Sequence, residues 1–394
     1  MSASSLPAFD PSDPLGVDDL LSPEDLAVRD TVRQWAGDRV LPRIAEWFES
    51  GEVPEIRGLA RELGSIGALG MSLDGYGCAG ASAVQYGLTC MELEAADSGI
   101  RSLVSVQGSL AMYAIHRWGS EEQKQRWLPA MAAGEVIGCF GLTEPDHGSD
   151  PAGMRTRARR DGTDWVLTGR KMWITNGSVA GVAVVWAQTE DGVRGFLVPA
   201  GTPGFSAPEI RHKMSLRASV TSELILDEVR LPADSALEVQ GLRGPLGCLN
   251  HARYGIVWGA MGAARASFEA ALEYAGSRVQ FDRPIGGFQL TQAKLADMAV
   301  ELHKGVLLAH HLGRRLDAGR LRPEQISFGK LNNVREAIEI CRTARTILGA
   351  NGISLEYPVM RHAANLESVL TYEGTVEMHQ LVLGKALTGL DAFR

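Results

Sequence analysis

Positive charge and long apolar runs are both scarce in this chain of 394 residues. Lysine and arginine together number 39, aspartate and glutamate 47, and the formal charge is −8. Proteins that bind nucleic acid or anionic membranes need clustered positive charge, so the charge balance argues against both classes. The best candidate for a membrane span, Tyr254 to Ala264, is closed by Arg253 and Arg265. It falls well short of the roughly eighteen apolar residues that a span requires, which excludes a transmembrane helix.

Cysteine is scarce as well, and its five occurrences are scattered along the chain. They are Cys78, Cys90, Cys139, Cys248 and Cys341. An odd number without any CxxC pair predicts neither a disulfide framework nor a zinc site, and it fits a reducing compartment. The first twenty residues lack the basic and apolar regions of a signal peptide, so we expect a polar arm on a cytoplasmic protein.

Local signals divide the remainder of the chain into three parts. Residues 21–137 carry helix signals, such as Ser22 before Pro23 and the capping-box pattern that begins at Ser120. Residues 138–240 carry short β-prone runs and two hairpin dipeptides, at 161–162 and 191–192. Residues 241–394 return to helical periodicity, and 289–316 and 323–349 each predict one long helix. The expected fold class is α+β, with an antiparallel β-domain between two helical domains.

Three local patterns leave two interpretations each. The segment Gly75–Gly80 matches GxGxxG, but no buried strand precedes it, so a glycine-rich connector is favoured over a dinucleotide site. The arginines at 155, 157, 159 and 160 suit a solvated strand face better than a phosphate site. The histidines at 303, 310 and 311 lie on a predicted helix, and without matching carboxylates a metal site is disfavoured.

Three further segments carry more chemistry. The loop from Cys139 to Asp150 is rich in glycine and hydroxyl side chains, which suits a flat polar ligand as well as an ordinary turn. The segment 171–177 adds Trp173, which could flank an aromatic ring. Glu373 lies between Tyr372 and Gly374 in an apolar region, where desolvation would raise its pKa toward that of a useful base. An exposed loop glutamate is the alternative.

Taken together and in this order, these segments resemble the acyl-CoA dehydrogenase family. The resemblance covers about residues 21–393 and rests on 141–145, 148–150, 171–176, 278–281, 349–352 and 372–375. Within the family, the segments 94–107, 249–256 and 360–375 look most similar to members that act on glutaryl-CoA. The resemblance implies a helical N-terminal domain, a β-domain and a C-terminal four-helix bundle in a homotetramer.

The resemblance also implies FAD as cofactor and acyl-CoA as substrate. The residues implied for FAD are Phe140, Gly141, Leu142, Thr143, Ser149, Trp173, Ile174, Thr175, Arg278, Phe281, Gln289, Thr346, Leu348, Gly349, Ala350, Thr375 and Phe393. Of these, Arg278 and Gln289 would reach the FAD of a neighbouring subunit. The residues implied for the substrate are Glu94, Arg101, Ser102, Ser105, Ser149, Leu246, Leu249, Asn250, Arg253 and Gly374.

The implied reaction removes the α-proton of an acyl thioester with Glu373 as base, while the flavin accepts a hydride. Arg101 would bind the distal carboxylate of glutaryl-CoA, with Glu94 seven residues earlier tuning that site. Loss of CO₂ would then give crotonyl-CoA, and electron-transfer flavoprotein would take the electrons. Two alternatives stay open: dehydrogenation of a neutral short-chain acyl-CoA, and a non-catalytic scaffold.

The sequence departs from the family pattern at two positions. Ala350 stands where many relatives have glycine, which places a methyl group near the expected pyrophosphate site. Leu370 replaces a polar residue just before the base segment, and we expect it to touch the substrate pocket.

Overall fold

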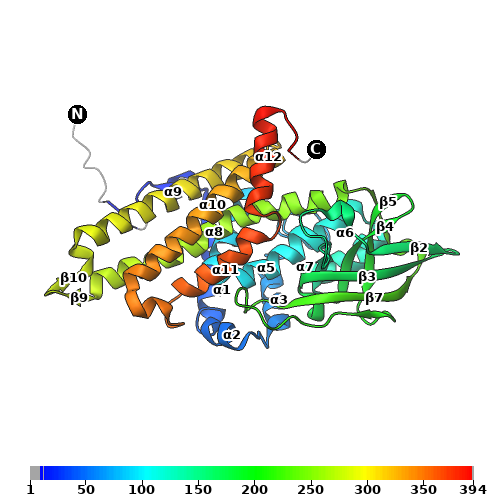
Figure 1. Cartoon of the computed structure of the whole chain (residues 1–394), viewed down its shortest axis with the longest axis horizontal. Helices are drawn as coiled ribbons and strands as arrows, with labels where there is room; N and C mark the ends of the chain where they lie inside the picture. Colours follow the sequence, from blue (N-terminus) through cyan, green and yellow to red (C-terminus); the bar gives the residue numbers. More distant parts are fainter. Residues whose placement is uncertain (1–8, 12, 393–394) are drawn as a thin grey trace.

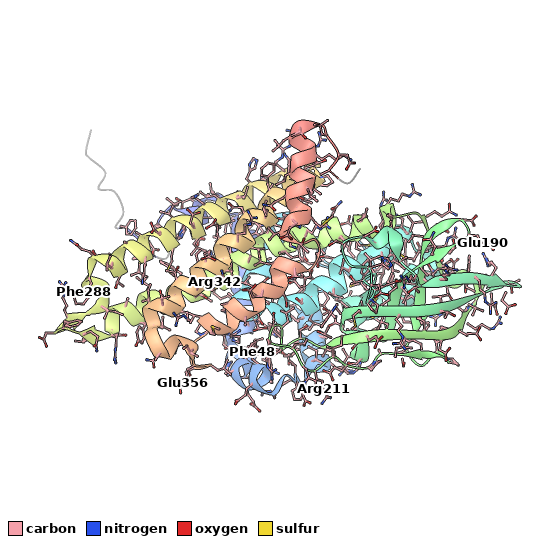
Figure 2. The ribbon with its side chains drawn as sticks, in the orientation of Figure 1. Phe48, Glu190, Arg211, Phe288, Arg342 and Glu356 are labelled. Carbon is pink, nitrogen blue, oxygen red and sulfur yellow. The ribbon has the colours of Figure 1, made fainter. Side chains whose placement is uncertain are left out.

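The computed structural model describes residues 9–11 and 13–392. The expected polar arm at residues 1–20 therefore lies partly outside the described residues. The molecule is elongated, with the sheet at one end and the β9–β10 hairpin (Val279–Gln280 and Arg283–Pro284) at the other (Figure 1). Glu190 marks the sheet end and Phe288 the hairpin end in Figure 2.

The N-terminal part is helical, as predicted. Ser22 and Ser120 form complete capping boxes, with Asp25 and Gln123 respectively. Each serine satisfies a free backbone N–H of the first turn, which fixes the start of α1 and α7. The helices are α1 (Pro23–Arg39), α2 (Ile44–Ser50), α3 (Ile56–Ser65), α4 (Ala83–Ala96), α5 (Ser98–Ser105), the π-helix η2 (Val106–Met112), α6 (Tyr113–Trp118) and α7 (Glu121–Ala132). The glycine-rich segment 75–80 is a connector between α3 and α4, as favoured.

A single extended residue, Asp97, separates α4 from α5. Its backbone has φ −166° and ψ 140°, and its side chain accepts a hydrogen bond from the N–H of Gly99 at 2.7 Å. The other carboxylate oxygen of Asp97 accepts hydrogen bonds from Arg361 at 2.6 Å and Asn365 at 2.9 Å. Asp97 therefore breaks the helix and ties the start of α5 to α11 (Val359–Thr371).

The middle part is a sheet with the order β6-β7-β3-β2-β4-β5-β8. Its strands are β1 (Gly138–Gly141), β2 (Arg157–Asp161), β3 (Asp164–Thr175), β4 (Val182–Thr189), β5 (Gly192–Pro199), β6 (Phe205–Ser206), β7 (Thr221–Leu231) and β8 (Ala236–Gln240). The two predicted hairpin dipeptides turn β2 into β3 and β4 into β5. Pairing is antiparallel except along β4, which pairs in parallel with β1 and at one position with β2.

The C-terminal part is again helical. Two predicted helices appear within one residue of their expected bounds, as α9 (Gln289–Asp317) and α10 (Pro323–Leu348). They pack with α4 and with α8 (Arg243–Ser277) around one large apolar core. The last helix, α12 (Val376–Thr388), projects from the bundle (Figure 1). In the part of the chain that the structure describes, no helix is long and apolar enough to cross a membrane.

Candidate active site

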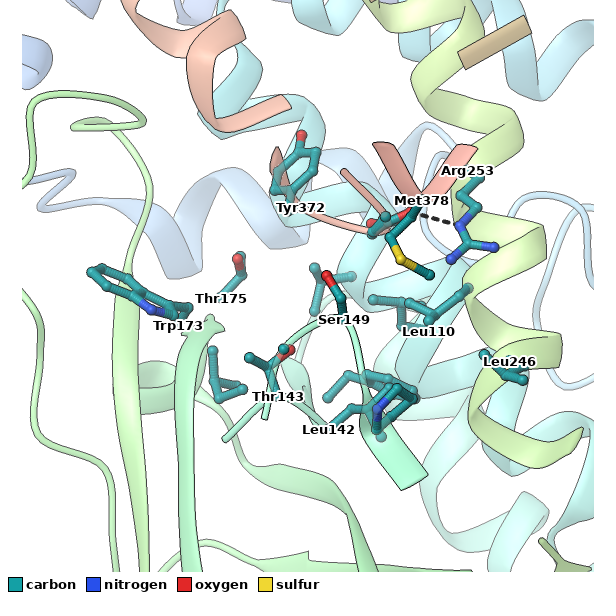
Figure 3. A pocket seen from close by; sticks show the side chains of 18 of the residues that line it. Leu110, Leu142, Thr143, Ser149, Trp173, Thr175, Leu246, Arg253, Tyr372 and Met378 are labelled. Carbon is teal, nitrogen blue, oxygen red and sulfur yellow. Dashed lines mark hydrogen bonds between the residues drawn. The ribbon is translucent and has the colours of Figure 1, made fainter. Parts of the chain in front are cut away.

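A cavity lies where the sheet meets the helices, and four parts of the chain line it (Figure 3). The sheet side contributes Phe140, Leu142, Thr143, Gly148, Ser149, Pro151, Trp173, Ile174 and Thr175. The helix side contributes Arg101, Ser102, Val106 and Leu110 from α5 and η2, and Leu246, Leu249 and Arg253 from α8. The segment between α11 and α12 contributes Tyr372, Glu373 and Gly374, and α12 itself Met378, His379 and Val382.

Glu373 lies in the turn between α11 and α12, with a left-handed backbone of φ 53°. Its carbonyl accepts a hydrogen bond from Nε of Arg253 at 2.6 Å, drawn in Figure 3. Its carboxylate Oε2 is buried and has no hydrogen-bond partner among the described residues. Desolvation raises the pKa of Glu373, while the positive charges of Arg101, Lys330 and Arg253 act against the rise. A carboxylate of raised pKa that faces a cavity is suited to accept a proton.

A buried cation lies close to this carboxylate. Arg101 is 1% exposed and donates through Nε to Oε2 of Glu94 at 2.7 Å, and through Nη2 to the hydroxyl of Tyr372. The guanidinium lies over the Tyr372 ring, 5.7 Å from its centroid. The other carboxylate oxygen of Glu94 is buried without a hydrogen-bond partner within the described ranges. A spacing of seven residues would place Glu94 and Arg101 on one side of a helix if the chain stayed helical across residues 98–99. They do meet, but across the break at Asp97.

The sheet side of the cavity fits a flat aromatic group. A bulge in the pairing of β3 with β7, between Lys171 and Ile174, gives Trp173 a left-handed φ of 62°. Trp173 is therefore 58% exposed at the edge of the cavity, with Thr143, Ser149 and Thr175 nearby (Figure 3). An exposed tryptophan beside hydroxyl groups is what the isoalloxazine ring of a flavin requires, namely an aromatic face and polar groups at its rim.

A buried ion pair holds the loop that carries these hydroxyl groups. Nζ of Lys171 lies 2.8 Å from Oε1 of Glu144 and donates to the carbonyl of Leu142 at 3.1 Å. Burial lowers the pKa of Lys171 to about 8, with Glu144 acting in the opposite direction. The Glu144 carboxylate also accepts the backbone N–H groups of residues 155 and 156. Gly141 belongs to β1, and an added Cβ there would lie 3.0 Å from the Leu224 side chain.

The remaining residues implied for the cofactor lie away from this cavity within one chain. Arg278 directly follows α8, Phe281 lies between β9 and β10, and Gln289 begins α9, so all three belong to the hairpin end of the molecule (Figure 1). A second group lies where α10 ends: Thr346 and Leu348 belong to its last turn, and Gly349 and Ala350 to the 3-10 helix η7 (Gly349–Ile353) that follows. Thr375 caps α12 through a hydrogen bond from the N–H of Met378. Phe393 lies outside the described residues.

The residues implied for the substrate divide into three placements. Seven line the cavity: Arg101, Ser102, Ser149, Leu246, Leu249, Arg253 and Gly374. Two support it from behind, because Glu94 pairs with Arg101 and Asn250 accepts a hydrogen bond from Arg253 at 3.1 Å. Ser105 is buried on α5, and its hydroxyl has no partner within the residues described.

Leu370 was expected at the substrate pocket, and that expectation is wrong for the described cavity. Leu370 lies instead with Lys330 and Val334 at a separate small cavity. The reason is helical geometry, because residue 370 still belongs to α11, whereas Glu373 lies beyond the helix end.

Sequence reasoning missed several residues that shape the site. Tyr372 contacts Arg101, and Lys330 on α10 contacts the carbonyls on both sides of Glu373. His379 is buried on α12, with Nδ1 bonded to Ser327 at 3.0 Å. The position of Tyr372 directly before the base was a usable signal. Lys330 and His379 carry none, because only the fold brings α10 and α12 to this loop.

Comparison with known proteins follows the same three parts. Residues 22–135, 139–229 and 239–388 match the N-terminal, middle and C-terminal domains of acyl-CoA dehydrogenases. The human mitochondrial short-chain specific acyl-CoA dehydrogenase is 34% identical over 361 residues, which are 90% of this chain and 87% of that protein.

Two crystal structures from Mycobacterium smegmatis are more similar. One glutaryl-CoA dehydrogenase is 70% identical, with a TM-score of 0.96 over 97% of this chain and 99% of that one. A glutaryl-CoA dehydrogenase in complex with FADH2 is 63% identical, with a TM-score of 0.96 over 98% of this chain and 100% of the other.

Proposed function

Because the chain belongs to the acyl-CoA dehydrogenase family, we propose that the cavity performs the reaction of a glutaryl-CoA dehydrogenase. The cofactor is FAD, and the substrate is an acyl-CoA. The observation that carries the proposal is a buried Arg101 lining the same cavity as an unpartnered Glu373 carboxylate. One group can bind a distal carboxylate and the other can remove an α-proton.

The position of the base explains the first step. Glu373 Oε2 has no competing hydrogen bond among the described residues, and its raised pKa makes it a better proton acceptor than an ordinary glutamate. The left-handed turn and the Arg253 contact fix the carboxylate relative to the cavity. When bound, FAD supplies the acceptor for the hydride that leaves the β-carbon.

The position of Arg101 explains the choice of a dicarboxylate. Burying a carboxylate without a partner costs several kcal/mol, so a pocket for glutaryl-CoA needs a cation. Arg101 uses Nε for Glu94 and one Nη for Tyr372, and its remaining N–H groups are available to the substrate. Glu94 and Tyr372 hold the guanidinium in place, and the Glu94 carboxylate balances its positive charge when no substrate is bound.

Glu373 also accounts for the decarboxylation step. Oxidation gives an α,β-unsaturated thioester whose γ-carbon carries the carboxylate, so the product is a vinylogous β-keto acid. Loss of CO₂ leaves the electron pair in a dienolate, and the Glu373 carboxylic acid returns the proton to the γ-carbon, which yields crotonyl-CoA. The carboxylate that removed the α-proton is thus regenerated in the same turnover.

The oligomeric state and the electron acceptor are also part of the proposal. Phe281 is 88% exposed and Leu290 is 81% exposed near Arg278, which supports a second copy of the chain covering this end. We propose a homotetramer in which Arg278 and Gln289 reach a neighbour's FAD, with electron-transfer flavoprotein as acceptor. The five cysteines are free, which supports a cytoplasmic location.

The deciding experiment compares glutaryl-CoA with butyryl-CoA in the purified flavoprotein. Anaerobic mixing should bleach the flavin with glutaryl-CoA, and steady-state turnover with an artificial acceptor should release one CO₂ per crotonyl-CoA detected by mass. Preferential bleaching by butyryl-CoA, or an unsaturated C5 product without CO₂, would contradict the proposal.

A further inference from the structure

One buried cation contacts the backbone on both sides of Glu373. Nζ of Lys330, on α10, donates to the carbonyl of Tyr372 at 2.5 Å and to the carbonyl of Gly374 at 2.6 Å. The Lys330 side chain is almost fully buried, and it does not line the main cavity described above. Burying an ammonium group costs free energy, so its hydrogen bonds, which an apolar side chain could not make, point to the reason that a lysine stands here.

The loop that Lys330 contacts needs such a constraint. Glu373 has φ 53° and Gly374 has φ 100°, and a glutamate rarely adopts a left-handed backbone without support. Arg253 donates to the carbonyl of Glu373, which lies between the two carbonyls bound by Lys330. Three successive carbonyls therefore point to cations on α8 and α10, and this fixes the direction of the Glu373 side chain.

Lys330 also differs from the neighbouring cations in how its charge is balanced. Arg101 on α5 is balanced by Glu94 on α4. Lys330 makes no ion pair within 4.0 Å in the described part of the chain, and its contacts are neutral carbonyls. Arg253 on α8 is likewise bound to neutral groups, but it lines the cavity and faces the substrate. His379 on α12 lies at the small cavity beside Lys330.

We infer that Lys330 is a positioning residue, which fixes the turn carrying Glu373 and sets the proton affinity of that carboxylate from behind. The inference rests on the proposed role of Glu373 as the base. The charged groups that act on Glu373 are Arg101, Arg253, Lys330 and Glu94, and the Tyr372 hydroxyl and the Cys90 thiol interact with it as well. Of the three cations, Lys330 is the one that does not line the cavity.

The titration of Lys330 is consistent with this role. Burial lowers its pKa to about 7, the charge of Glu373 acts against that shift, and Arg253 and Arg101 add to it. Near neutral pH the ammonium therefore depends on the negative charge of Glu373, and the carboxylate depends on the ammonium.

The test uses Lys330→Met, Lys330→Arg and the control Lys304→Met. Lys304 is an exposed lysine on α9 paired with Glu301, so the control removes the same charge from the surface. The rate of flavin reduction by glutaryl-CoA is measured anaerobically across about pH 6 to 9.

Lys330→Met should slow the reaction at least about 10-fold and raise the pKa that governs it by about one unit or more. Lys330→Arg should lose rate but keep the governing pKa near that of the wild type, and Lys304→Met should change neither. Loss of rate by one constant factor at every pH in Lys330→Met would reduce Lys330 to a structural residue and overturn the inference. An unchanged rate would overturn it as well.

A double variant covers the case in which Lys330→Met does not fold. Lys330→Met/Glu373→Gln removes the negative charge that Lys330→Met leaves without a nearby cation behind it, so it should have a higher Tm and flavin occupancy than Lys330→Met alone. Equal instability of the two would overturn the inference. Failure of the proposed function would give a different result, because glutaryl-CoA would then still reduce the flavin of Glu373→Gln.

Discussion

Nε of Arg101 lies 2.7 Å from Oε2 of Glu94, although Asp97 breaks the helix between them. Both side chains are almost completely buried. A pair of this kind stabilises the fold little, because removing two charges from water offsets much of their attraction. Its value lies in holding a guanidinium in a fixed orientation at the end of the cavity.

The first prediction concerns specificity. Arg101→Ala alone would strand the Glu94 charge, so the informative variant is Glu94→Gln/Arg101→Met, which removes both charges. We expect its kcat/KM for glutaryl-CoA to fall by the equivalent of roughly 2–5 kcal/mol, and its kcat/KM for butyryl-CoA to change little. An equal loss for the two substrates would mean that Arg101 is structural and that the neutral short-chain reaction is the better account.

The second prediction concerns the base. Glu373→Gln keeps the shape of the side chain but removes its basicity, so FAD and acyl-CoA should still bind. Flavin reduction should slow by at least about 10²-fold. Stopped-flow bleaching measures this directly, and flavin content with a ligand-binding titration serves as control. Bleaching at the wild-type rate would refute the assignment.

The third prediction concerns the hairpin end. Arg278→Ala should lower flavin occupancy and loosen the oligomer, because we place this guanidinium on a neighbour's FAD pyrophosphate. Arg159→Ala is the matched control, since it removes an exposed arginine from the sheet end. Absorbance ratios give the occupancy and analytical ultracentrifugation the assembly. A fully loaded, stable monomer would contradict the prediction.

The fourth prediction concerns acid stability. Glu92 on α4 lies between Arg33 and Arg265, 3.0 Å and 2.6 Å from their nitrogens. Burial opposes ionisation, but the two arginines prevail and lower the pKa of Glu92 to about 2, from 4.5. The unfolded chain then binds more protons than the folded one, so the stabilisation is complete above about pH 4.5 and is lost as pH falls toward 2.

Glu92→Gln should therefore reduce the free energy of unfolding by about 3 kcal/mol at neutral pH. The difference from the wild type should shrink as pH falls, which urea unfolding at roughly pH 7, 5 and 3 would measure. A difference that stays constant with pH would assign the loss to packing rather than to charge.

The sequence predicted those features whose causes are local. Capping at Ser22 and Ser120, the two hairpin dipeptides, and the bounds of α9 and α10 all follow from signals within a few residues. The residues at the base segment and at the sheet side of the cavity could be identified from their combination.

Features that depend on distant parts of the chain could not be predicted. Lys330 reaches Glu373 from 43 positions away in the chain, and nothing around it marks a catalytic neighbour. The left-handed backbone of Trp173 results from a bulge that exists only once β3 pairs with β7. The placement of Arg278 and Gln289 on a cofactor depends on another copy of the chain, so it stays a prediction.

The bonds of Asp97 to Arg361 and Asn365 join the helix that carries Arg101 to the helix that leads into Glu373. Hydrogen bonds therefore link the two elements that carry the two ends of the proposed substrate site. If glutaryl-CoA binds as proposed, the separation of Glu373 and Arg101 sets the length of the acyl chain, because the chain must contact both residues at once. We therefore expect discrimination between dicarboxylates of different length to be lost when Asp97 is replaced by alanine, even though Asp97 touches no substrate.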